Sequence, residues 1–148
     1  MAELFKKILI ATDGSKWTQN AVETGLKLAR EQQSKVYVLY VVDTITFTSM
    51  PMDVTWVNMY QLLKDEGEGA VKAIKDSPDA QGLDVETNVL EGHPAVEITK
   101  FASDNGVDLI VIGTLGKSGI ERILLGSTAE KVIRISHCPV LVIKSSKK

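Results

Sequence analysis

Residues 110–136 constrain this chain most, because they join a strand pattern to a helix pattern through a long loop. β-Branched and aliphatic residues between 107 and 112 predict a buried strand that ends at Gly113. Beyond the loop, Ser127 and Glu130 match a capping box at the start of a helix. The helix itself is predicted from apolar or small residues spaced i, i+3, i+4 and i+7: Ala129, Val132, Ile133 and Ser136.

Four glycines occupy the loop or its borders: Gly113, Gly116, Gly119 and Gly126. Glycine lets backbone N–H groups approach a phosphate closely, and the free N–H groups at a helix start attract an anion. A flexible surface loop with an ordinary helix cap would show the same residues, so the residues alone leave both interpretations open. The spacing excludes a P-loop, which needs glycine where this chain has Val111, and it excludes the dinucleotide fingerprint G-x-G-x-x-G.

Four further apolar runs predict strands, at residues 4–11, 35–42, 83–90 and 139–144. Helical patterns separate the strands: one after Ser15 as N-cap, one over 57–74, one from Pro94 and the one after Ser127. Strands that alternate with helices imply right-handed βαβ units and a parallel sheet. We therefore predict a single α/β domain over residues 1–148, with five strands and four helices.

Thr12 and Asp13 come directly after the first predicted strand. They therefore lie at the carboxyl edge of the predicted sheet, where open α/β folds bind their ligands. A turn or capping role would account for the aspartate equally well.

Composition narrows the class of protein. The net charge of −2 over 148 residues gives no indication of nucleic acid as a partner. No apolar run approaches the ~20 residues of a membrane span, and the first ten residues lack the plan of a signal peptide. The one cysteine, Cys138, allows no internal disulfide and fits a reducing compartment, so we expect a cytoplasmic protein.

The glycine spacing resembles a known motif. Gly113, two residues, Gly116, nine residues and Gly126-Ser127 match the nucleotide-binding motif of the universal stress protein family, in its ATP-binding branch. Three more segments match in order, so the resemblance covers the whole chain: Lys6–Ser15, Tyr40–Asp43 and Cys138–Ile143. It implies a Rossmann-like fold, an open parallel sheet of strand order 3-2-1-4-5 with helices on both faces.

The resemblance also implies a ligand, ATP, with Mg²⁺ or Mn²⁺ bound through the phosphates. It places adenine and ribose near Asp13 and the backbone of Val41, and the phosphates against the glycine backbone and the helix-start hydroxyls. It assigns no catalytic residue and no metal ligand. The predicted binding residues are Thr12, Asp13, Val41, Ile112, Gly113, Gly116, Gly126, Ser127 and Thr128.

Three functions fit this resemblance: a nucleotide-dependent stress-response or signalling switch, a slow ATPase or phosphotransferase, and an interaction module that no longer uses nucleotide. The complete set of glycines argues against the third. The apolar strand 139–143 is predicted at the sheet edge, where exposed apolar strands invite pairing with another chain. In the family this strand pairs across a two-fold axis, so we expect a homodimer, and a protein partner is compatible with a signalling role.

Overall fold

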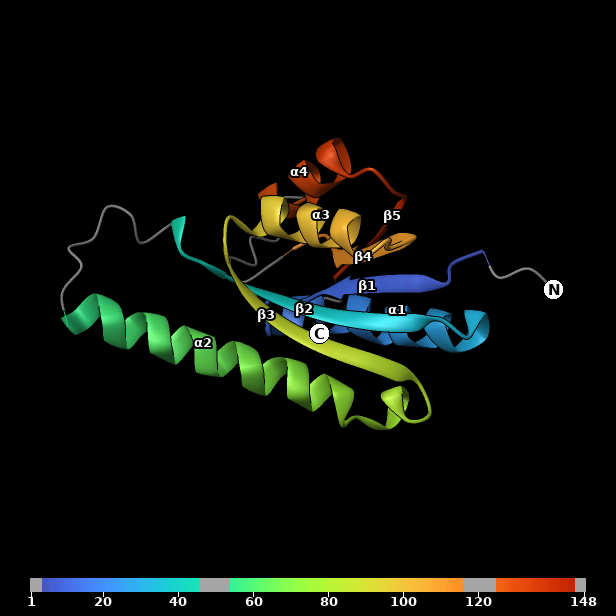
Figure 1. Ribbon diagram of the computed structural model, residues 1–148, viewed down its shortest axis with the longest axis horizontal. Helices are drawn as coiled ribbons and strands as arrows, with labels where there is room; N and C mark the ends of the chain where they lie inside the picture. Colours follow the sequence, from blue (N-terminus) through green and yellow to red (C-terminus); the bar gives the residue numbers. More distant parts are fainter. Residues whose placement is uncertain (1–3, 46–53, 116–124, 146–148) are drawn as a thin grey trace.

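The computed structural model describes residues 4–45, 54–115 and 125–145. Its five strands form one parallel sheet in the order β3-β2-β1-β4-β5, which confirms the expected order (Figure 1). The strands are β1 (Lys7–Ala11), β2 (Lys35–Asp43), β3 (Asp84–Gly92), β4 (Leu109–Gly113) and β5 (Val140–Ile143). β1, β2 and β4 are rich in β-branched and aliphatic residues because helices cover both of their faces.

Helices lie on both faces of the sheet, as expected (Figure 1). They are α1 (Gln19–Gln32), α2 (Val54–Lys75), α3 (Pro94–Asp104) and α4 (Ser127–Ile135), with short 3₁₀ turns at Lys16–Thr18 and Pro78–Ala80. α1 and α2 cover one face, and α3 and α4 cover the other. Among the described residues, no helix combines the length and the apolar character needed to cross a bilayer.

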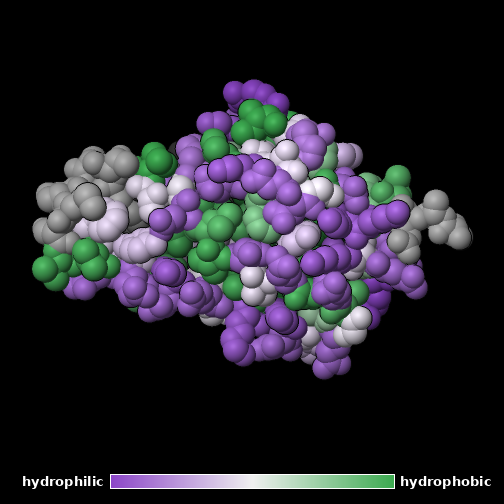
Figure 2. Space-filling view, in the orientation of Figure 1, coloured by the Kyte–Doolittle hydropathy of each residue, from purple (hydrophilic) through white to green (hydrophobic). Residues whose placement is uncertain are grey.

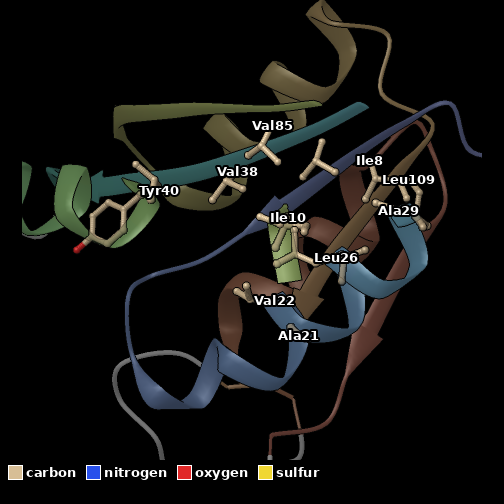
Figure 3. Packing of buried hydrophobic residues seen from close by; sticks show 14 of the residues in the cluster. Ile8, Ile10, Ala21, Val22, Leu26, Ala29, Val38, Tyr40, Val85 and Leu109 are labelled. Carbon is tan, nitrogen blue, oxygen red and sulfur yellow. The ribbon is translucent and has the colours of Figure 1, made fainter. Parts of the chain in front are cut away.

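Alternating side chains of β1 supply the two cores. Ile8 and Ile10 face α1 and belong to one core cluster with Leu26 of that helix, and Figure 3 shows this packing. Leu9 and Ala11 face the opposite side and join α3 and α4. Successive side chains of a strand point to opposite faces of the sheet, so this one short strand contributes to the packing against both layers of helices. Figure 2 shows apolar side chains at the outer surface as well, including the end of the molecule where α2 begins.

β2 and β3 extend further toward the carboxyl edge of the sheet than β1 does. β1 pairs with β2 only as far as Ala11, which lies opposite Leu39. β2 and β3 stay paired for four more residues of β2, from Tyr40 to Asp43, which lies opposite Gly92. Among the described residues, the carboxyl end of β2 therefore has a strand neighbour on one side only, and its residues Val41, Val42 and Asp43 line the candidate site.

One predicted helix start is wrong. α1 begins at Gln19 rather than directly after Ser15, because Lys16–Thr18 first form a 3₁₀ turn. Ser15 is the N-cap residue of that turn, but its side chain makes no capping hydrogen bond, and within the described residues its buried Oγ has no hydrogen-bond partner. The N-cap residue of α1 is Thr18, so the prediction of Ser15 as the helix cap was wrong.

Candidate functional site

A cavity of about 380 Å³ opens at the carboxyl edge of the sheet, where the chain order reverses between β1 and β4. This volume is within the range of small-molecule sites, and the position is the one at which open α/β sheets bind ligands. Eight of the nine predicted binding residues line it: Thr12, Asp13, Val41, Ile112, Gly113, Gly126, Ser127 and Thr128. The ninth, Gly116, lies outside the described residues.

A tight turn presents Asp13 to the cavity. The Oδ1 atom of Asp13 accepts a hydrogen bond of 2.9 Å from the N–H of Ser15, and Gly14 adopts φ +78°, a conformation that glycine reaches without strain. The N–H of Thr12 donates to the carbonyl oxygen of Leu39 at 3.0 Å, the last main-chain hydrogen bond between this segment and β2. The turn both ends β1 and fixes one oxygen of the carboxylate.

The backbone of Val41 offers the cavity one donor and one acceptor. The N–H of Lys35 and the carbonyl of Leu39 both bond to the β1 side, and residues two apart on a strand point the same way. Val41 therefore turns its N–H and its C=O toward that side, beyond the point where β1 ends. Within the described residues neither group has a hydrogen-bond partner on that side.

The start of α4 differs from the predicted capping box. Gly126 is the N-cap residue, and its carbonyl accepts the first helical hydrogen bond, from the N–H of Glu130 at 3.0 Å. Ser127 is thus the first helical residue and not the cap. The Glu130 side chain reaches forward to Arg134, one helical turn later, instead of back to the helix start. The cap is a glycine, and within the described residues the helix start has no side-chain capping hydrogen bond.

The free donors lie one position later than expected. The N–H of Gly126 is taken by the carbonyl of Thr114 at 2.6 Å, so it is not available to a ligand. The N–H groups of Ser127, Thr128 and Ala129 belong to the first turn, which has no intrahelical partners for them. All three residues line the cavity. The helix dipole adds partial positive charge at this point, which favours an anion.

Several further residues of the cavity lining are apolar. Leu39, Ile98 and Ile112 line the cavity from β2, α3 and β4, and Leu63 lines it from α2. Sequence reasoning missed Leu63 and Ile98, although both belong to helices that were predicted. Pro94 also lines the cavity, and its position after the third strand was the signal that could have placed α3 at this edge.

The charged groups of the described lining are two carboxylates, Asp13 and Asp43. The described lining includes no lysine, arginine or histidine, and Lys117 and Arg122 lie outside the described residues. In the described part of the chain, no three His, Cys, Asp or Glu side chains group as a metal site. Positive potential in the described lining therefore comes from the helix start.

Comparison with known proteins assigns the chain to a family. The model of the universal stress protein family matches residues 4–144. The chain belongs to the universal stress protein family. Universal stress protein MJ0531 of Methanocaldococcus jannaschii is 48% identical over 145 residues, which cover 98% of this chain and 85% of that protein. Universal stress protein YxiE of Bacillus subtilis is 34% identical, with 95% of this chain and 100% of that protein covered.

Solved structures of universal stress proteins share the fold. The structure of MJ0577, a further M. jannaschii member, is 32% identical and superposes with a TM-score of 0.85, covering 98% of this chain and 99% of the other. A universal stress protein in complex with cAMP is 25% identical, with a TM-score of 0.73 and coverage of 97% and 99%. The fold of this universal stress protein thus agrees with that of its solved relatives.

Proposed function

We propose that this protein binds an adenine nucleotide, ATP with Mg²⁺ or Mn²⁺, and acts as a nucleotide-dependent stress-response or signalling switch. One observation carries the proposal: the same cavity is lined by Val41 and by the start of α4, and within the described residues the β1-facing backbone groups of Val41 and the first-turn N–H groups of α4 have no hydrogen-bond partner. The cAMP complex of a related universal stress protein supports an adenine nucleotide as the ligand class.

At the sheet end, the backbone of Val41 matches the edge of adenine. The ring nitrogen N1 of adenine accepts a hydrogen bond and its amino group donates one, which complements an N–H and a C=O side by side. Apolar walls supplied by Leu39, Ile98 and Ile112 suit the faces of a flat base. The second carboxylate oxygen of Asp13 has no hydrogen bond within the described residues and would accept from ribose hydroxyls.

At the helix end, the N–H groups of Ser127, Thr128 and Ala129 would hold phosphate oxygens. The hydroxyls of Ser127 and Thr128 lie on the same turn, and the Ser127 hydroxyl is free of the capping role that would have competed for it. Gly126 keeps this turn close to Thr114, where a Cβ would meet the carbonyl at 3.0 Å. A divalent ion would be held chiefly by the phosphates, as is usual where the protein supplies no cage.

The test is to denature freshly purified protein and identify the released small molecules by mass spectrometry. We expect ATP at close to one molecule per chain. ADP instead would favour the slow ATPase or phosphotransferase, and a turnover assay with Gly126→Ala as the control would follow. A protein that is empty and also fails to bind added ATP with Mg²⁺ would overturn the proposal and favour the interaction module.

We also propose that the chain works as one domain, in the cytoplasm, and as a homodimer through β5. β5 lies at the sheet edge, and its four residues Val140–Ile143 are all apolar and only half-buried. Pairing with a second copy would satisfy that edge. Light scattering at micromolar concentration should show a dimer, and a monomer under those conditions would contradict this assembly. A separate protein partner fits a signalling role.

A further inference from the structure

We propose that Thr18 is a positioning residue that fixes Asp13, and that it thereby sets the preference of the site for nucleotides carrying ribose hydroxyls. This inference rests on the proposed nucleotide-binding function. Thr18 lies three residues after the matching segment Lys6–Ser15, and it is the last residue of the 3₁₀ turn that precedes α1.

The threonines Thr12 and Thr18 form a chain of hydrogen bonds with a defined direction. The Oγ1 of Thr18 donates to the carbonyl of Ser15 at 3.0 Å, since a carbonyl can only accept. That bond uses the one hydroxyl proton of Thr18, so in the 2.9 Å contact between the two hydroxyls Thr12 is the donor. Thr12 in turn accepts from the N–H of Gly14 at 3.1 Å.

The direction of these hydrogen bonds changes the role of Thr12. Its hydroxyl proton is committed to Thr18, so Thr12 has no donor to offer a phosphate or a ribose. Both threonines are buried, with 7% of Thr12 and 5% of Thr18 exposed. Buried hydroxyls need partners: Thr12 donates to Thr18, and Thr18 donates to the carbonyl of Ser15. We therefore interpret Thr12, predicted to bind the ligand directly, as a support for the turn.

The hydroxyl of Thr18 makes these bonds instead of capping α1. It occupies the N-cap position of α1, where a threonine normally caps the helix through its hydroxyl, yet it makes no capping hydrogen bond. Its oxygen instead contacts Thr12 and Ser15, on the turn that follows β1. Sites where a local rule is set aside are often functional ones.

The consequence reaches Asp13 through the turn that follows it. Thr12 holds the N–H of Gly14. The Thr18 hydroxyl adds a second hydrogen bond to the carbonyl of Ser15, which also accepts from the backbone N–H of Thr18 at 3.2 Å. Ser15 is the residue whose N–H fixes Oδ1 of Asp13 at 2.9 Å. With the turn held at both ends, the second oxygen of Asp13 stays in place for a ribose hydroxyl. Without Thr18, the carboxylate would still line the cavity but would lose its fixed orientation.

The experiment measures the dissociation constants of ATP and 2′,3′-dideoxy-ATP, with Mg²⁺, for wild type and variants. Hydrogen bonds to a charged group are strong enough that wild type should prefer ATP by about tenfold or more. In Thr18→Val the preference should fall below about threefold, while Thr18→Ser should keep it. Asp13→Ala should abolish it, and adding Thr18→Val to Asp13→Ala should change the ratio no further.

Matched controls separate positioning from general damage. Thr99→Val removes a hydroxyl that bonds to Ala95 and Val96 on α3, away from the cavity lining, and should leave the ratio unchanged. If Thr18→Val does not fold, Thr12→Val interrupts the same chain from its other end and should show the same loss.

The outcomes distinguish this inference from the proposed function. A wild type that binds neither nucleotide would refute the proposed function, and the inference with it. A wild type that binds both equally, or a folded Thr18→Val with an unchanged ratio, would overturn the inference and leave nucleotide binding standing. Equal losses in Thr18→Ser and Thr18→Val would also overturn it, because the serine keeps the hydroxyl.

Discussion

Gly126→Ala tests the proposed phosphate site at the start of α4 most directly. The backbone of Gly126 has φ −68° and ψ 162°, which alanine adopts freely, so torsional strain is not the cause of any effect. A Cβ there would lie 3.0 Å from the carbonyl oxygen of Thr114, closer than carbon and oxygen normally pack. The same oxygen accepts a hydrogen bond of 2.6 Å from the N–H of Gly126, so the two backbone segments are already in close contact.

The crowding must be relieved by α4, because Thr114 is anchored. The N–H of Thr114 donates to the carbonyl of Ile143 at 2.9 Å, and its Oγ1 accepts from the N–H of Ser145 at 3.2 Å. We expect the helix start to shift by a few tenths of an ångström and to carry its free N–H groups with it. Misaligning one or two bonds to a charged phosphate costs about 1–3 kcal/mol, which is about 5–150-fold in ATP affinity.

Stability should change much less than affinity. Alanine restricts the unfolded chain more than glycine does, which favours folding by about 0.4–1 kcal/mol and offsets part of the crowding. We therefore expect a Tm within about 4 °C of wild type. Gly69→Ala on α2 is the matched control, since nothing lies within 4 Å of its added Cβ. It should stabilise the protein by about 0.5–1 kcal/mol and leave affinity unchanged.

Calorimetric titration with ATP, ADP, AMP and adenosine provides the assay. The loss caused by Gly126→Ala should shrink as phosphates are removed and should be within about twofold for adenosine. An unchanged ATP affinity, or an equal loss for ATP and adenosine, would refute the assignment of the α4 start as the phosphate site.

Three further predictions address the remaining parts of the site and its surroundings. GTP should bind at least about tenfold more weakly than ATP in competition titrations, because guanine presents a donor and an acceptor in the reverse order to the Val41 backbone. Ser127→Ala should weaken ATP binding but leave the unfolding free energy in urea within about 0.5 kcal/mol, since Ser127 is not the cap; a loss near 1 kcal/mol would contradict this. Tyr60 donates to the Glu91 carboxylate, and this bond raises the pKa of the phenol above 10.0. The stability advantage of wild type over Tyr60→Phe should be complete below pH 10 and disappear as the pH rises through that raised pKa, and an advantage that grows with pH would be inconsistent with the bond.

The strands were the most predictable part of the fold. β1, β2 and β4 are covered on both faces, so each appears in the sequence as a short apolar run. Alternation with helices gave the parallel arrangement, but it did not give the order of the strands. The order 3-2-1-4-5 came from the family resemblance, because local patterns carry no information on which strands become neighbours.

Hydrogen-bond partners in the site were the least predictable. Ser15 and Ser127 both occupy positions typical of helix caps, and neither side chain caps. A capping pattern is a local signal, and it cannot register a competing arrangement built from distant residues. At α4 that arrangement is the contact of Gly126 with Thr114, twelve positions earlier in the chain, which makes the glycine the cap residue. Thr18 was missed for the same reason, because its partner lies on the other side of the turn.

Strand length, more than side-chain identity, creates the adenine end of the proposed site. β1 stops at Ala11 because Asp13 and Gly14 turn the chain, whereas β2 continues beside β3 to Asp43. Among the described residues, the backbone of Val41 is left with a strand neighbour on one side only, which is what leaves it available in the proposed site. Any aliphatic residue at 41 would keep this donor and acceptor. An insertion into the turn at 12–14 would let β1 run further, pair with residue 41 and occupy both groups. Recognition at this end therefore depends on where β1 ends, which in turn depends on the hydrogen bonds that hold the turn.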